Sequence, residues 1–126
     1  LNGGLTTLNQ IQTELERFDG AMIGREAYQN PWFLAELEEG IFGHSVIANR
    51  HAIARAMMDY AAQQHQLYGT PIKSITRHIL GLFQGQRGAK DWKRTLSTRP
   101  YQDGADETVI LEALEAVDKA IHKAAA

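Results

Sequence analysis

The stretch from residue 72 to residue 97 restricts the fold most, because its apolar residues recur at the spacing of one buried helix face. Before the glycine-containing sequence at residues 85–88, these residues lie at Ile72, Ile75, Ile79, Leu82 and Phe83. After it, Ala89, Trp92 and Leu96 repeat the spacing over a shorter run. The pattern predicts two short amphipathic helices that are separated by a break at residues 85–88.

The same region holds most of the positive charge. Residues 71–100 contain seven Lys or Arg and one acid, a net charge of +6, whereas all other residues contain six basic and fourteen acidic side chains, a net charge of −8. Cationic side chains on the outside of a helical bundle are often simply solvated. The strong bias in sign favours the alternative, a face that binds a polyanion such as nucleic acid. Its members are Lys73, Arg77, Lys90, Lys93 and Arg94, with Arg87 and Arg99 in the adjoining loops.

Further helices are expected on both sides of this region. A stripe that begins at Leu8 predicts a helix capped by Thr6 or Thr7, and Asn30-Pro31 predicts the start of another that ends near Gly40. Longer amphipathic patterns cover residues 50–68 and about 106–123. The fold class expected is mainly α, with a C-terminal helical bundle on short loops.

The first 30 residues have a different pattern. Leu1 to Gly4 is typical of a strand end and a glycine turn, and the apolar run at residues 21–23 is typical of a second strand, followed at once by Gly24-Arg25. We interpret these residues as a βαβ fragment that ends in two glycine-containing loops at the carboxyl ends of neighbouring parallel strands, and we expect the chain to be part of a longer protein. Loops after adjacent parallel strands can together bind a phosphate. The simpler alternative is that the glycines only turn the chain.

Several classes of site find no support in the sequence. The chain has no cysteine, and its five histidines include no pair four residues apart on one predicted helix, so we expect no metal site and no catalytic residue here. No apolar run approaches the roughly 20 residues that span a bilayer. We expect a cytoplasmic protein.

Three segments together resemble the tRNA-dihydrouridine synthases of the bacterial A-type subfamily. They are Asn2-Gly3-Gly4, the run from Met22 to Pro31, and the run from Ile75 to Gly85. The resemblance extends over essentially the whole chain but only over the C-terminal third or so of such an enzyme. It implies the terminal βα part of an FMN-binding TIM barrel over residues 1–40 and a helical tRNA-binding domain over residues 41–126.

The resemblance also implies roles for individual residues. The FMN phosphate would be held by Asn2, Gly3, Gly4, Gly24 and Arg25. Lys90 and Lys93 occupy positions where the family usually has arginines that contact tRNA, and lysine lacks the planar fork of arginine. Arg77, His78 and Arg94 are further tRNA candidates because they adjoin these segments.

Members of the family use NADPH to reduce the flavin, which then reduces uridines of the tRNA D-loop to dihydrouridine. Their general acid is a cysteine in the barrel, so we expect this chain to be inactive alone. We also expect apolar surface that the rest of the barrel would cover to allow oligomer contacts. The rival hypothesis is a helical protein–protein interaction module whose basic face docks an acidic partner.

Overall fold

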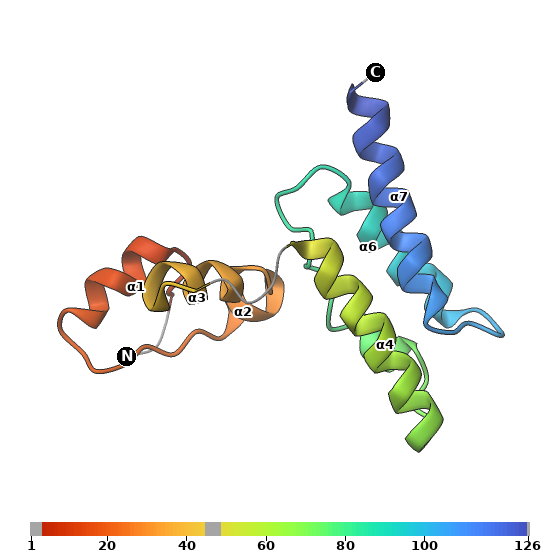
Figure 1. The fold of residues 1–126 in the computed structure, drawn as a ribbon, viewed down its shortest axis with the longest axis horizontal. Helices are drawn as coiled ribbons and strands as arrows, with labels where there is room; N and C mark the ends of the chain where they lie inside the picture. Colours follow the sequence, from red (N-terminus) through yellow and green to blue (C-terminus); the bar gives the residue numbers. More distant parts are fainter. Residues whose placement is uncertain (1–3, 45–48, 126) are drawn as a thin grey trace.

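The computed structural model describes residues 4–44 and 49–125 of the chain, and the fold in these ranges is built from helices (Figure 1). Helices α1 to α3 form one part of the molecule and α4 to α7 form the other. The mainly α fold class is confirmed. In chain order the elements are α1 (Leu8–Leu15), α2 (Arg25–Gln29), α3 (Phe33–Phe42), α4 (Arg50–Tyr68), α5 (Lys73–Thr76), α6 (Ala89–Thr98), the 3-10 helix η1 (Arg99–Tyr101) and α7 (Thr108–Ala125).

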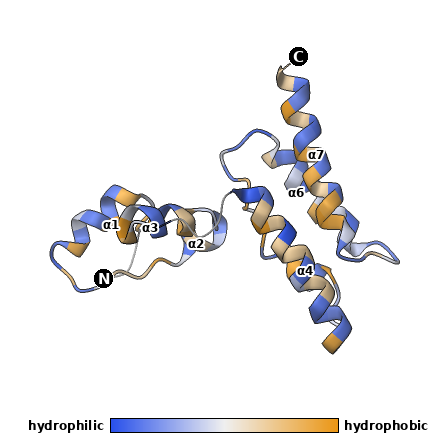
Figure 2. Cartoon of the chain, in the orientation of Figure 1, coloured by the Kyte–Doolittle hydropathy of each residue, from blue (hydrophilic) through white to orange (hydrophobic). Residues whose placement is uncertain are grey.

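Each part has its own hydrophobic core. In the first part, Ile11 of α1 packs with Phe33 and Leu37 of α3. The larger core of the second part contains the predicted stripes, and Trp92 and Leu82 are fully buried in it. The helices around these cores carry both hydrophilic and hydrophobic residues, as amphipathic helices do (Figure 2). The expected domain boundary after residue 40 stays a prediction, and α3 itself continues to Phe42.

Local sequence signals set several helix ends correctly. Thr7 caps α1, with Gln10 completing a reciprocal capping box. The long helix α4 begins and ends where its pattern predicts, because the Asn49 side chain accepts from the Ala52 N–H and Gly69 adopts a left-handed conformation. Among the described residues, no helix has the length and apolar composition needed to span a bilayer.

Two local predictions in the first part are wrong. Asn30-Pro31 does not start α3, because the Asn30 N–H donates to the Glu26 carbonyl at 2.8 Å and Asn30 therefore ends α2. The expected strand at residues 21–23 is reduced to an isolated bridge at Met22, and the described residues contain no strand. A strand forms only where a neighbour pairs with it along several residues.

The prediction of the first basic helix, before residues 85–88, is also wrong. Only Lys73–Thr76 is helical, and residues 77–84 form a series of turns in which N–H groups bond three residues back. The backbone carbonyls here have partners far along the chain: the indole N–H of Trp92 donates to Ile79 at 2.8 Å, and Arg50 Nε donates to Leu82 at 3.0 Å. The apolar stripe of this segment is nevertheless buried as predicted.

The position of Arg99 in a predicted loop suggested that it could reach a ligand. In the structure its guanidinium is already paired within the fold. Its guanidinium makes a two-pronged ion pair with Glu112 of α7, with Nε 2.6 Å from Oε2 and Nη2 2.9 Å from Oε1. This pair ties the 3-10 helix η1 to α7. The hydrogen bond from Arg99 holds the pKa of Glu112 below its ordinary value of 4.5, and the same contact raises the pKa of Arg99.

This ion pair predicts a pH-dependent contribution to stability. Because the pKa of Glu112 is lowered by folding, the pair stabilises the fold fully above the unfolded value near 4.5 and less as pH falls through the lower folded value. We expect Glu112→Gln to lower the midpoint of urea unfolding at pH 7, with a difference from wild type that disappears under acidic conditions. Glu115→Gln, at an exposed position on the same helix, is the control. An equal loss at pH 3 and pH 7 would contradict the prediction.

Candidate cofactor and nucleic-acid sites

Three of the five predicted phosphate-binding residues lie around one hollow. Gly4, Gly24 and Arg25 line a concave space of about 540 Å³, together with Leu5, Thr6, Met22, Glu26 and Gln29. Asn2 and Gly3 lie outside the described residues. Two loops distant in sequence therefore face one space, as the parallel arrangement of the glycine turns suggested. Contact with an FMN phosphate stays a prediction.

The lining of this hollow offers one charged group that can bind an anion. Arg25 is the one cation among the described residues that line it. Gly4 has a φ of +67°, a left-handed conformation, and a Cβ atom added there would meet no heavy atom within 4 Å. The backbone at Gly4 is thus open to close approach by a ligand. Glu26 is the one acid in the lining, and its carboxylate lies 3.5 Å from the Asn30 amide nitrogen.

The predicted tRNA-binding residues separate into two groups. Arg77, His78 and Lys93 line a second hollow of about 360 Å³ beside Tyr28 of α2. Lys90 and Arg94 are exposed on α6 and do not line it, and Arg94 lies 3.6 Å from the carboxylate of Asp91 on the same helix. The structure therefore brings three of the five residues around one space and leaves two on the adjoining helix.

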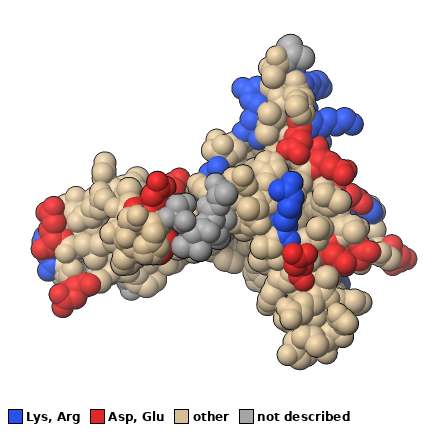
Figure 3. Space-filling view, viewed as in Figure 1, with Lys and Arg blue, Asp and Glu red and all other residues tan. Residues whose placement is uncertain are grey.

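Two basic residues that the sequence analysis did not include lie next to α6. Lys119 and Lys123 of α7 share a shallow hollow with Asp91. On the face shown in Figure 3, blue Lys and Arg side chains accordingly gather around the C-terminal end of α7, while red Asp and Glu side chains lie mainly nearer its start and on the first part. A charge count limited to residues 71–100 missed them, since α7 meets α6 only through tertiary packing.

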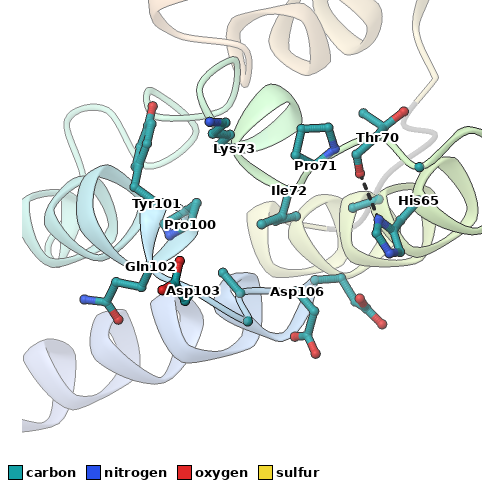
Figure 4. A pocket seen from close by; sticks show the side chains of 15 residues that line it. His65, Thr70, Pro71, Ile72, Lys73, Pro100, Tyr101, Gln102, Asp103 and Asp106 are labelled. Atoms are coloured by element: carbon teal, nitrogen blue, oxygen red, sulfur yellow. Dashed lines mark hydrogen bonds between the residues drawn. The ribbon is translucent and has the colours of Figure 1, made fainter.

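A third hollow, of about 350 Å³, has the opposite character. It lies between the end of α4 and the loop that leads into α7, and Asp103, Asp106 and Glu107 are part of its lining with Lys73. Figure 4 shows this space with Tyr101 and Pro100 on one side and His65, bonded to the Thr70 carbonyl, on the other. Three carboxylates against one lysine make it a poor site for a phosphate. Among the described residues no group of three or more His, Asp or Glu is placed to hold a metal ion.

Comparison with known proteins decides the family. The family described as "Dihydrouridine synthase (Dus)" matches residues 1–124. The chain belongs to the dihydrouridine synthase family. It is 42% identical to a tRNA-dihydrouridine(20/20a) synthase of Shewanella oneidensis over 118 residues, which cover 93% of this chain and 35% of that protein.

Other relatives carry the same description. The chain is 45% identical to the protein from Escherichia coli K12, covering 93% of this chain and 34% of the relative, and 41% identical to that from Vibrio cholerae, covering 90% and 35%. The chain thus spans about a third of the length of the relatives it matches.

In this member of the dihydrouridine synthase family, the two parts meet through Arg50 and Gly81. The Arg50 guanidinium lies over the ring of half-buried Trp32, 4.9 Å from its centre, while its Nε bonds to the Leu82 carbonyl. Burial lowers the pKa of Arg50, and the carboxylate of Glu36 acts in the opposite direction. One side chain therefore contacts both the first part and the turns of the second.

Gly81 explains why a glycine interrupts an apolar stripe. A Cβ atom at this position would lie 1.9 Å from the carbonyl oxygen of Gln29, and that neighbour is backbone rather than a flexible side chain. The close approach of α2 thus leaves no space for any side chain at residue 81. Close packing of the backbone at Gln29 therefore accounts for the glycine at residue 81.

Gly81→Ala is expected to destabilise the junction of the two parts. We expect a loss of about 1–3 kcal/mol in the free energy of unfolding, the usual cost of overpacking, because either α2 or the turns must shift. Gly20→Ala is the matched control, since a Cβ atom there meets nothing within 4 Å. Urea unfolding followed by circular dichroism measures both, and equal stability of the two variants would contradict the close approach.

Proposed function

We propose that this chain supplies tRNA binding and part of the FMN-phosphate site of a flavin-dependent tRNA-dihydrouridine synthase. The observation that carries the proposal is the agreement of its relatives, which match over 93% of the chain and are described as tRNA-dihydrouridine(20/20a) synthases. The chain would form the C-terminal portion of such an enzyme, with residues 1–40 completing the barrel and residues 41–126 binding tRNA. We propose that the activity is cytoplasmic, where a tRNA substrate would be encountered.

The cofactor part of the proposal rests on the hollow around Gly4, Gly24 and Arg25. In these residues the enzyme would hold the phosphate of a flavin, which would supply the hydride for reduction of the uracil ring with NADPH as the reductant. The residues fit its phosphate, because exposed backbone at Gly4 and Gly24 permits close approach and the Arg25 guanidinium offers charge-assisted hydrogen bonds. Arg25 would hold and orient the phosphate and leave the ring to residues elsewhere in the barrel.

The tRNA part of the proposal rests on charge. Lys93 and Arg77 line one hollow, Lys90 and Arg94 continue the cationic surface along α6, and Lys119 and Lys123 of α7 lie beside it. Such side chains neutralise phosphates and release counterions, so affinity falls as salt rises. The chain alone would bind tRNA without reducing uridine, because it contains no cysteine to act as the general acid.

Self-association of the isolated chain follows from its exposed apolar side chains. The first part leaves Phe42 at 65%, Met22 at 54% and Leu34 at 52% exposure, which is high for residues of this type. We propose that the rest of the enzyme covers this surface. In the isolated chain, a second copy would take its place.

A tRNA-binding titration at two salt concentrations tests the nucleic-acid role. We expect affinity to fall steeply with salt. The double variant Lys90→Gln with Lys93→Gln should reduce the slope of log K against log salt by roughly 1.4–1.8, the loss of two phosphate contacts. Arg17→Gln with Arg55→Gln is the matched control, since it removes two exposed cations from outside α6 and α7. Bulk tRNA should displace labelled tRNA, whereas an acidic protein should not. Displacement by the acidic protein alone would instead support a protein–protein module.

Comparison of FMN with riboflavin tests the phosphate site, because the two ligands differ only in the phosphate group. We expect the chain to bind FMN more tightly, as measured by chemical-shift titration of backbone amides. Arg25→Gln should bring the two affinities together, and Arg17→Gln should leave the difference unchanged. Equal binding of both ligands to the unaltered chain would contradict a phosphate site.

A further inference from the structure

The hollow beside α2 has a chemical character that its individual residues do not reveal. Tyr28 comes from the first part of the chain, and Arg77, His78, Gln84 and Lys93 come from the second. Among the residues that line this space of about 360 Å³, two are cations and none is acidic. Its position between the two parts means that a ligand here contacts both.

Hydrogen bonding determines which nitrogen of His78 carries the proton. The Nε atom of Arg77 lies 3.2 Å from His78 Nε2, and Tyr28 Oη lies 3.0 Å from His78 Nδ1. An arginine in a protein stays protonated, so its Nε–H can only donate, and His78 Nε2 must therefore accept. The neutral ring then carries its proton on Nδ1 and donates to the hydroxyl oxygen of Tyr28.

This order of donors leaves the remaining guanidinium N–H groups of Arg77 available to a ligand. The Nε–H of Arg77 is occupied by His78, so the Nη1 and Nη2 atoms remain as a planar pair of donors. Such a pair matches two oxygens of a phosphate. Tyr28 accepts through its oxygen from His78 Nδ1 and so holds the His78 ring in the orientation that accepts from Arg77. The Tyr28 and His78 rings also meet edge to face, with centres 5.8 Å apart, which restricts the motion of both.

We propose that this hollow is a subsite for one phosphodiester group of RNA, bound by Arg77 and Lys93 and held in shape by His78 and Tyr28. The inference deepens the proposed function and rests on it. It assigns different roles to neighbouring residues that the sequence analysis treated alike: Arg77 contacts the phosphate, whereas His78 is a positioning residue that acts through Arg77. Tyr28, which the sequence analysis did not include, joins the site from α2.

The position of α2 links this subsite to the cofactor hollow. Gln29 lines both spaces, and Arg25 and Tyr28 belong to the same short helix. The close contact of Gly81 with the Gln29 carbonyl holds that helix against the turns that carry Arg77 and His78. The phosphodiester would therefore lie next to the cofactor hollow and not at the far end of the helical part.

The test is a set of single and double variants of this chain in tRNA-binding titrations. We expect Arg77→Ala to weaken binding on the order of tenfold and to reduce the salt slope by roughly 0.7–0.9, the loss of one phosphate contact. Arg55→Ala, which removes an exposed cation from α4, is the control for charge alone. Arg77→Lys keeps the charge but lacks the planar fork, so it should restore the slope without restoring the affinity.

The role of His78 is tested by coupling to Arg77. His78→Ala and Tyr28→Phe should each weaken binding severalfold in the unaltered chain and have no further effect when Arg77 is already alanine. His78→Gln should recover most of the affinity, because its amide oxygen can accept from Arg77 Nε. Thermal unfolding of each variant shows whether the fold is lost. A loss of the fold would weaken binding equally in chains with and without Arg77.

Three outcomes are distinguishable. Coupling of His78 and Tyr28 to Arg77 would support the subsite. Two results would overturn the subsite and leave the proposed function intact. One is that Arg77→Ala does not change tRNA binding, and the other is that His78→Ala weakens binding equally in chains with and without Arg77. Absence of salt-dependent tRNA binding in the unaltered chain would overturn both.

Discussion

The side chain of Trp92 is the interaction on which the second part of the molecule depends. It is fully buried, and its indole N–H donates to the Ile79 carbonyl at 2.8 Å. The centre of its ring lies 4.9 Å from the centre of the Phe83 ring. A buried donor without a partner costs about 1–3 kcal/mol, so this bond strongly favours the observed path of the backbone. Phe83 in turn meets His51 of α4 edge to face, and His51 bonds to Asp118 of α7 at 2.8 Å. One indole therefore organises α4, α6, α7 and the turns between α5 and α6.

The turns that Trp92 holds are also the surface that receives the first part. Because residues 77–84 do not continue as a helix, Gly81 meets the backbone of Gln29 and His78 meets Tyr28. The Leu82 carbonyl accepts from Arg50 Nε, and the guanidinium of Arg50 lies over the Trp32 ring of the first part. These three contacts are different in kind: a close backbone approach, a polar side-chain pair and a cation over a tryptophan ring. Together they set the distance between the cofactor hollow and the cationic residues. An irregular segment is thus the structural link between the two candidate sites.

Features encoded by neighbouring residues were predictable from sequence. The ends of α4 follow from Asn49 and Gly69, the cap of α1 from Thr7, and the burial of Leu82 and Trp92 from helical spacing. Features that depend on distant partners were not. Helical spacing at residues 72–83 predicted a helix, yet spacing records only which side is buried, and Ile79 and Leu82 direct their carbonyls to Trp92 and Arg50 instead.

The candidate sites divide in the same way. Gly4, Gly24 and Arg25 were found from glycine turns, and Arg77 and Lys93 from a local excess of charge, because each signal lies within a few residues. Tyr28 gave no such signal, since an exposed tyrosine on a five-residue helix becomes a site residue only when His78 is placed beside it. Arg99 had the same local signal as its neighbours, and only its pairing with Glu112 removed it from the cationic surface.

By itself, the sequence determined the family, the mainly α class, the buried stripes and the region where positive charge collects. These properties depend on residue type and spacing, which determine backbone capping, burial and net charge without reference to the rest of the chain. The tertiary structure alone decided where a helix gives way to turns, which cations are already paired, and that α7 adds Lys119 and Lys123 to the surface of α6. Those properties depend on which groups meet across the core and the junction, and hydrogen bonds between such groups have no periodicity along the chain.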